Sequence, residues 1–268
     1  MRIVTLLENT SCREDLRCEH GLSLYVEAEG KRILFDAGQT GLFAQNATLL
    51  GVDLASVDLA VLSHGHYDHG GGLARFLQVN STAPIYVSSH AFEPHFNALG
   101  KDIGMDPGLE QCPSLIHADQ PTVLAENIVL YPASCLPCPF PSEPWGLETL
   151  RGGIRVPEDF RHEQYMLVIQ GGKRILFSGC SHKGILNIVN YFRPDILIGG
   201  FHLSKQEDPR ELARIARQLA QYPTVYCTGH CTGQVQYAHM KRILGNRLCC
   251  LSTGTELTVS ENGDIILT

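Results

Sequence analysis

The sequence has little charge and no cluster of basic residues. Only 18% of its 268 residues are charged, the formal net charge is −7, and lysine and arginine never occur in a run longer than two. Because nucleic-acid phosphates are bound by clustered cations, this distribution argues against a nucleic-acid partner. It still allows a localised site for a small-molecule substrate, which could be anionic or phosphorylated.

Long apolar segments are also missing. No stretch reaches the roughly 20 apolar residues of a membrane-spanning helix, and the apolar run at 3–7 is too short for the core of an export signal. We therefore expect a cytoplasmic protein without a membrane partner, whose ten cysteines are reduced unless they bind metal. The sequence contains no Gly-x-Gly-x-x-Gly motif or P-loop for phosphate binding, and its oligomeric state stays open.

What is present is the alternation of an α/β protein. At this length, with 44% hydrophobic residues, we expect a single domain over 1–268. The proline-rich region 100–163 is expected to be an irregular insertion over the active-site end of the fold. Periodicity predicts strands at 2–8, 22–28, 31–36, 58–63, 84–88, 127–132, 164–170, 173–178, 195–200, 224–228 and 255–260, and helices at 42–50, 71–79, 184–192, 207–221 and 234–244.

One segment occurs twice. Residues 30–35 and 172–177 are both Gly-Lys-Arg-Ile-Leu-Phe, and each copy follows an apolar strand and a glycine-containing turn. Each therefore predicts a β-hairpin that continues into a loop of small residues. The repeat has two interpretations: chance reuse of a good strand sequence, or two related halves whose hairpins end at one shared central site.

The strongest chemical signal is the cluster of polar residues at 63–72. Three histidines and an aspartate follow a predicted buried strand, and glycines at 65 and 70–72 allow a tight turn. His64 and His66 point the same way in an extended segment, so both can bind one metal ion. Asp68 and His69 turn toward a second position a few ångströms away. Imidazole and carboxylate together suit Zn, Mn or Fe.

This motif, His-x-His-x-Asp-His after a strand, resembles the hallmark of the metallo-β-lactamase superfamily, and the resemblance covers nearly the whole chain. Segments 179–184, 199–203 and 229–233 resemble the branch that includes the dihydropterin ribofuranosylaminobenzene-phosphate synthases, most of whose bacterial members are described as metal-dependent hydrolases. The resemblance implies an αββα sandwich of two mixed sheets flanked by helices. It also implies a site for two divalent ions at one edge, between the sheets.

Further ligands follow from the resemblance. Cys180 stands where one zinc β-lactamase subclass has a thiolate ligand, and His230 stands where the superfamily has its last histidine ligand. His162, placed before Cys180, matches another ligand histidine, although the branch often has an acidic residue there and Glu163 is adjacent. Asp36 resembles the carboxylate that accepts a hydrogen bond from a ligand histidine and so orients it.

Two more histidines are expected near the reacting atoms. His182, just past Cys180, is a ligand or a proton donor to the leaving group, and His202, at the end of a predicted strand, faces the same cleft and contacts substrate. Cys231 is expected to pack around the site. The other histidines, at 20, 90, 95, 117 and 239, are expected to be surface residues or satisfied residues, although those at 90 and 95 could face the cleft.

These residues predict a metal-dependent hydrolase. Two ions, with zinc favoured by the Cys180 thiolate and Mn or Fe as alternatives, would make a hydroxide available for attack on an ester, lactone or phosphoester. Asp68 would take up a proton, and His182 or His202 would assist the leaving group. The alternatives are a pterin-related synthase that catalyses a condensation, an iron-dependent redox enzyme, and a metal sensor without catalysis.

Overall fold

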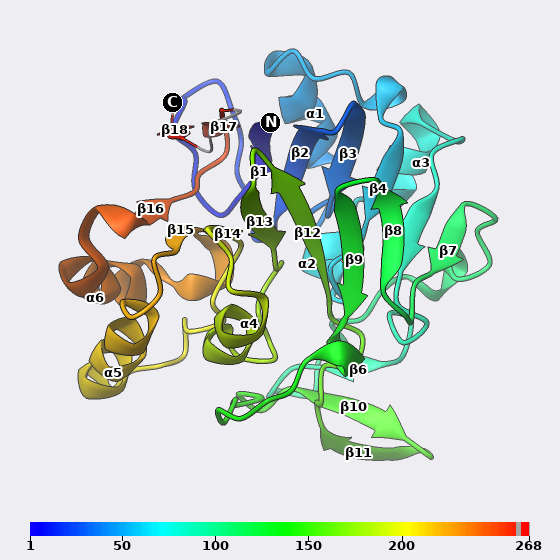
Figure 1. Ribbon diagram of the computed structural model, residues 1–268. Helices are drawn as coiled ribbons and strands as arrows, with labels where there is room; N and C mark the ends of the chain where they lie inside the picture. Colours follow the sequence, from blue (N-terminus) through cyan, green and yellow to red (C-terminus); the bar gives the residue numbers. More distant parts are fainter. Residues whose placement is uncertain (261–263, 268) are drawn as a thin grey trace.

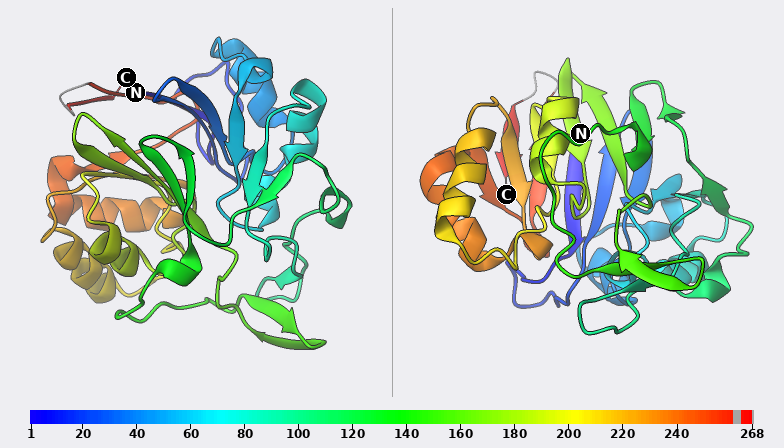
Figure 2. Two further views of the ribbon diagram at one scale, coloured as in Figure 1. Left: turned by 45° about the vertical axis from the view of Figure 1, so that its right-hand side comes forward. Right: turned by 90° about the horizontal axis from the view of Figure 1, so that it is seen from below.

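The apolar segments form two large mixed sheets that pack face to face, with helices on both outer sides (Figures 1 and 2). The computed structural model describes residues 1–260 and 264–267. Within them, the first sheet has the order β18 (Ile265–Leu267), β17 (Glu256–Val259), β1 (Arg2–Leu7), β2 (Ser23–Ala28), β3 (Lys31–Phe35), β4 (Leu59–Val61), β5 (Ile85–Val87) and β7 (Leu115–His117). The second has the order β16 (Leu248–Cys250), β15 (Val225–Thr228), β14 (Ile196–Ile198), β13 (Lys173–Phe177), β12 (Gln164–Gln170), β9 (Ile128–Pro132) and β8 (Thr122–Ala125).

The helices cover the outer faces of the sheets. α1 (Leu42–Leu49), α2 (Tyr67–Gly70) and α3 (Leu73–Val79) belong to the first half, and α4 (Ile185–Phe192), α5 (Pro209–Leu219) and α6 (Gln234–Leu244) belong to the second. This is the predicted αββα architecture. No helix within 1–260 and 264–267 has both the length and the apolar character needed to cross a membrane.

Alternating side chains of the central strands divide the core into layers. Phe35 and Phe177 point between the sheets, where their ring centroids lie 5.6 Å apart. Leu34 and Leu176 point outward, into the separate clusters under the helices of their own half. Successive strand residues face opposite sides of a sheet, so strands covered on both faces are apolar throughout.

The repeated segments occupy equivalent places in the two sheets. Leu24 pairs with Phe35 in the β2–β3 hairpin, and Met166 pairs with Phe177 in the β12–β13 hairpin. On one side of each hairpin, β4, β5 and β7 or β14, β15 and β16 continue in parallel. On the other side, β1 and β17 or β9 and β8 are antiparallel. This common order supports the interpretation of two related halves.

The structure corrects the expectation that 100–163 is irregular apart from the strand predicted at 127–132, which is β9. β7 and β8 from this region also join the two large sheets, and β10 (Glu148–Arg151) pairs with β11 (Ile154–Pro157) and β6 (His95–Phe96) in a small third sheet. That sheet lies at the bottom of Figure 1. The prediction failed because most of the unpredicted strands (β6, β7, β8, β11, β16 and β18) are short edge strands, and several of them are largely exposed, so their alternation is weak.

Candidate metal centre

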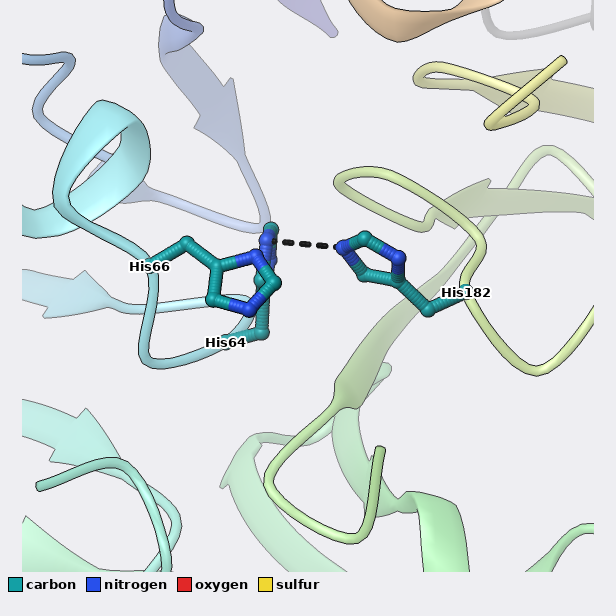
Figure 3. A group of neighbouring side chains, drawn as sticks. All are labelled: His64, His66 and His182. Carbon is teal, nitrogen blue, oxygen red and sulfur yellow. Dashed lines mark hydrogen bonds between the residues drawn. The ribbon is translucent and has the colours of Figure 1, made fainter. Parts of the chain in front are cut away.

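The loop after β4 brings four polar side chains to the edge between the sheets. His64 lies in a bend after the strand, and His66 has extended backbone. α2 begins directly after His66, which turns Asp68 and His69 toward the neighbouring position. Gly65 permits this path, because a Cβ there would lie 2.0 Å from the carbonyl oxygen of Ala91. In Figure 3 the His182 ring, from the other half of the chain, approaches His64 and His66 from the opposite side.

Nitrogen, oxygen and sulfur atoms from both halves meet at this edge at close range. The Nε2 atoms of His64 and His182 are 3.2 Å apart, and those of His69 and His230 are also 3.2 Å apart. Cys180 Sγ lies 3.1 Å from His69 Nε2. Around them, the donor atoms form triads within 4.8 Å: His64, His66 and His182; His64, His69 and Cys180; and His20, Asp68 and His230.

Hydrogen bonds on the far sides of the rings determine which nitrogens carry protons. His69 Nδ1 faces the Asp36 carboxylate at 2.7 Å, and His230 Nδ1 faces Asn9 Oδ1 at 2.8 Å. Both partners are acceptors, since Asn9 Oδ1 also accepts from the N–H of Gly21. In their neutral forms His69 and His230 therefore present unprotonated Nε2 atoms to each other, and such a pair needs a shared proton or a cation between them.

The same argument applies to His64. Ser63 Oγ donates to Asp36 at 2.7 Å and so accepts from His64 Nδ1 at 2.8 Å, which leaves Nε2 of His64 unprotonated toward His182. Asp36 also accepts the Ser63 N–H at 2.7 Å. One buried carboxylate thus fixes the orientation of two candidate ligands, as predicted for Asp36.

The electrostatics agree with a site built for positive charge. Burial lowers the pKa of His69, but the carboxylates of Asp36 and Asp68 outweigh it and raise this pKa to about 9. Burial, reinforced by neighbouring imidazoles, holds the pKa values of His64 and His182 well below their usual range. Burial raises the pKa of the Cys180 thiol well above its usual range, so a thiolate there needs a cation. The donor set therefore fits a soft divalent metal ion.

Two buried glutamates hold the loops of the second half in place. Glu163 accepts the N–H groups of His182 and Lys183 at 2.6 and 3.0 Å. Glu8 accepts the N–H groups of His230 and Thr10. Each carboxylate fixes the backbone of a candidate ligand through main-chain hydrogen bonds.

The backbone is strained at four positions around the site. Asp36, Ser181, His202 and His230 have φ between 46° and 60°, in the left-handed region that residues with a side chain seldom adopt. Such conformations cost of order 1–3 kcal/mol each and cluster at functional sites. Here they turn the chain sharply at strand ends, toward the meeting point of the two halves.

The structure brings together most of the predicted site residues. His64, His66, Asp68, His69, Cys180, His182 and His230 converge, and His202 lies beside His182 with ring centroids 4.1 Å apart. His162 differs: its Nδ1 accepts the Gly65 N–H at 2.8 Å, and it groups with His66 and His95 behind the site. The position opposite His64 belongs to His182.

Several neighbours of the site carried no signal in the sequence. His20 Nε2 lies 3.1 Å from Asp68 Oδ2, although His20 precedes β2 in a segment without a motif. Cys231 has its donor atom within 4.8 Å of those of Cys180 and His202, so it joins the polar cluster in addition to packing. His95, expected to be at the surface, satisfied or facing the cleft, is buried and has Glu158 as a hydrogen-bond partner on Nδ1.

A cavity of about 620 Å³ opens onto the candidate ligands. Its volume is typical of small-molecule sites. Ile103, Leu147 and Leu251 line its apolar wall, and Asn97 and Lys205 add polar groups. His66, Asp68, Cys180, His182, His202 and His230 also line this cavity.

The chain is similar to known proteins over most of its length. The chain is 29% identical over 261 residues to the 7,8-dihydropterin-6-methyl-4-(β-D-ribofuranosyl)-aminobenzene-5′-phosphate synthase of Methanocaldococcus jannaschii, covering 87% of this chain and 88% of that protein. It is also 29% identical, over 91% of its length and 99% of the relative, to an uncharacterized protein of the same organism.

Solved structures share the fold. Tm1679, a metal-dependent hydrolase of the β-lactamase superfamily, superposes with a TM-score of 0.81 at 27% identity, covering 97% of this chain and 99% of the other. Zn²⁺-bound PqqB from Methylobacterium extorquens shares the fold alone, with a TM-score of 0.57 at 12% identity over 96% of this chain and 100% of the other. The family model of the metallo-β-lactamase superfamily matches residues 16–230, most of the length. The chain belongs to the metallo-β-lactamase superfamily.

Proposed function

We propose that this protein is a hydrolase that uses two divalent metal ions to cleave an ester, lactone or phosphoester bond of a small molecule. The observation that carries the proposal is a pair of imidazole nitrogens beside the cavity that need a shared proton or a cation between them. His69 and His230 direct their Nε2 atoms at each other over 3.2 Å, while Asp36 and Asn9 occupy the protons on their far sides.

The donors divide between two positions. His64, His66 and His182 would hold one ion, and Asp68, His69 and His230 the other. Cys180 groups with both His64 and His69, so it can contact both ions. A thiolate among imidazoles favours zinc over manganese or iron.

The bound ions would supply a Lewis acid and water of lowered pKa at neutral pH. The remaining work belongs to the chain. Asp68 Oδ2 lies 3.1 Å from His20 Nε2 and 3.3 Å from His230 Nε2, so a proton accepted by Asp68 has a route to the exposed His20 ring. His202 lines the cavity beside His182 and is placed to donate a proton to a leaving group.

The cavity suggests what the substrate looks like. Lys205 lines it and holds its ammonium group 3.0 Å from the carbonyl oxygen of Trp145. A lysine in the lining of a cavity that also has apolar residues suits a small molecule with an anionic or phosphorylated end. Because the net charge of the chain is −7, attraction of an anionic substrate would depend on a local positive charge such as Lys205.

Metal content and turnover test the proposal together. Protein purified without chelator or an affinity tag is measured for metal per chain by plasma mass spectrometry and screened against esters, lactones and phosphodiesters. We expect close to two zinc ions, and hydrolysis that chelation abolishes and added zinc restores. Full activity after exhaustive metal removal would contradict the proposal, and two iron ions would favour redox chemistry.

The identity with the Methanocaldococcus jannaschii synthase supports a second candidate, a pterin-related condensation. In that case a pterin should raise the melting temperature of the metal-loaded protein, and none of the simple esters should be turned over. A substrate screen run in parallel with pterin binding distinguishes the two functions.

A further inference from the structure

A second polar cluster lies behind the candidate metal centre, on the side of His66 away from the cavity. It consists of His66, His95, Glu158 and His162, all of which are buried. The Nε2 atoms of the three histidines have no hydrogen-bond partner among the described residues. Their donor atoms nevertheless lie within 4.8 Å of one another. Buried polar groups are rarely left unpaired, so this cluster needs an explanation.

The contacts on the far sides of these rings again determine the protons. His95 Nδ1 lies 2.7 Å from Glu158 Oε2 and must donate to it, so Nε2 of a neutral His95 is an acceptor. His162 Nδ1 accepts the Gly65 N–H at 2.8 Å, so Nε2 of a neutral His162 carries the proton. That proton lies toward Glu158 Oε1, 3.8 Å away.

His66 belongs to both groups of histidines, the one with His64 and His182 and the one with His95 and His162, and can use a different ring nitrogen for each. The residue lines the cavity, but its Nε2 is buried without a partner, which leaves Nδ1 for the metal position shared with His64 and His182. A histidine that binds a metal ion through Nδ1 keeps its proton on Nε2. The acceptor available to that proton is His95 Nε2, because the donor atoms of His66 and His95 lie within 4.8 Å and their rings meet edge-on with centroids 5.3 Å apart. The two Nε2 atoms are not hydrogen-bonded in the structure, so the rings must move closer for this bond to form.

We propose that, when His66 binds metal, Glu158 and His95 form a hydrogen-bonded chain that orients it: Glu158 accepts from His95 Nδ1–H, and His95 Nε2 accepts from His66 Nε2–H after the two rings have moved together. The proposal rests on the proposed function in one respect, namely that His66 binds metal. His95 and Glu158 are thus positioning residues, and they act on the metal only through His66. Histidine ligands are commonly oriented by such a second hydrogen bond.

The proton on His162 argues against a third metal ion in this cluster. Binding an ion through Nε2 would require His162 to lose that proton or to turn away from the Gly65 N–H. The chain through His95 instead pairs the Nε2 atoms of His66 and His95 with no change of protonation. It also assigns a task to the small third sheet, since His95 lies on β6 and Glu158 follows β11.

Zinc affinity of paired variants tests the proposal. His95→Phe keeps a ring but removes the acceptor, whereas His95→Gln offers an amide oxygen near the position of Nε2. We expect His95→Phe to weaken one of the two zinc ions by about 10- to 100-fold, and His95→Gln to restore most of the loss. Affinities come from competition with a chromophoric chelator, and His117→Phe, at an exposed histidine on β7, is the control.

Nitrogen NMR of the wild-type protein labelled in histidine provides a readout that does not depend on the folding of a variant. In the zinc-loaded form we expect the proton on Nε2 of His66 and on Nδ1 of His95. A proton on His95 Nε2, a third zinc ion that His95→Phe loses, or unchanged affinity in His95→Phe would each overturn the proposal. A wild-type chain that binds no metal would instead refute the proposed function.

Discussion

The two halves of the molecule share one strand order but supply different chemistry at equivalent strand ends. After the repeated strand, the first half has Asp36, which orients His64 and His69, whereas the second half has Ser178, whose Oγ bonds to Ser181 at 2.8 Å. After the next strand, the first half provides its whole ligand loop. In the second half, the candidate ligands Cys180 and His182 follow the repeated strand β13, and His230 follows β15. The common strand order therefore determines which strand ends can carry metal ligands, and the local sequence determines which of these positions have one.

The largest effect should come from removing one ligand from each half. His66→Ala in the first half and His182→Ala in the second should remove the same ion, because both belong to one donor triad. Several kcal/mol of lost metal assistance corresponds to a fall of about 10³-fold in kcat/KM. Metal content per chain and turnover of each variant check this, and two retained ions in His182→Ala would contradict the arrangement.

A smaller effect should separate the equivalent positions 36 and 178. Asp36→Asn removes the carboxylate that orients two histidines, so zinc affinity should fall by about 10- to 100-fold. Ser178→Ala removes only a hydroxyl–hydroxyl bond and should leave affinity within about threefold, from the small net worth of one neutral hydrogen bond. Calorimetric zinc titration measures the affinity of both variants. Equal losses of zinc affinity would contradict the different roles assigned to Asp36 and Ser178.

The pH dependence of metal binding should also differ between the two positions. A proton on His69, whose pKa is about 9, competes with metal at the Asp68, His69 and His230 position. Affinity there should fall about tenfold per pH unit below 9, from simple proton competition. His64 and His182 have lowered pKa values and stay neutral from pH 7 to 9, so their imidazoles add no pH dependence to the other position. The proton of the Cys180 thiol, whose pKa is raised, must leave in either case, so His69 makes the difference between the two positions. Zinc titrations at several pH values check this.

The same raised pKa has a consequence for the metal-free chain. The protonated form of His69 stabilises the fold, and that contribution is complete below about pH 6.5, the usual histidine value, and lost as pH rises through about 9. The melting temperature of metal-free protein should therefore fall over that window. A shallower profile for Asp36→Asn over the same range would support the assignment to His69, because Asp68 still raises the pKa of His69 in that variant.

The smallest effects should be equal in the two halves. Ile33 and Ile175 are equivalent residues of the repeat, and both are fully buried between the sheets. Ile33→Val and Ile175→Val should each lower the free energy of unfolding by about 0.5–1.5 kcal/mol. Denaturant unfolding of the two variants measures this, and a clear difference would mean that the halves pack unequally despite their common topology.

Much of the fold could be predicted because its central strands are buried on both faces. The parallel strands β4 and β14 are apolar throughout, and each repeated strand ends in a buried Ile-Leu-Phe run, which gives a clear signal. The edge strands β7, β8 and β11 could not be predicted, because exposed strands keep neither a continuous apolar run nor strict alternation. Tertiary pairing, and not local preference, makes them strands.

For the site as well, residues close together in the sequence could be predicted, and contacts that depend on tertiary structure could not. His64, His66, Asp68 and His69 are local in sequence, so their spacing was informative. His182, and not His162, faces His64, because His162 Nδ1 accepts a hydrogen bond from the Gly65 N–H. The spacing of residues in the sequence does not reveal that bond. His95 and Glu158 are 63 residues apart and meet only when the third sheet forms.

The close approach of His69 and His230 has a consequence for assembly. These residues are separated by 161 positions in the chain, and His64 and His182 by 118. Contacts of such long range form late, after both sheets have docked, so metal capture should follow folding rather than guide it. Once bound, each ion joins segments from opposite halves. The metal-loaded chain should therefore unfold as one unit, and ever more slowly as free metal becomes more abundant.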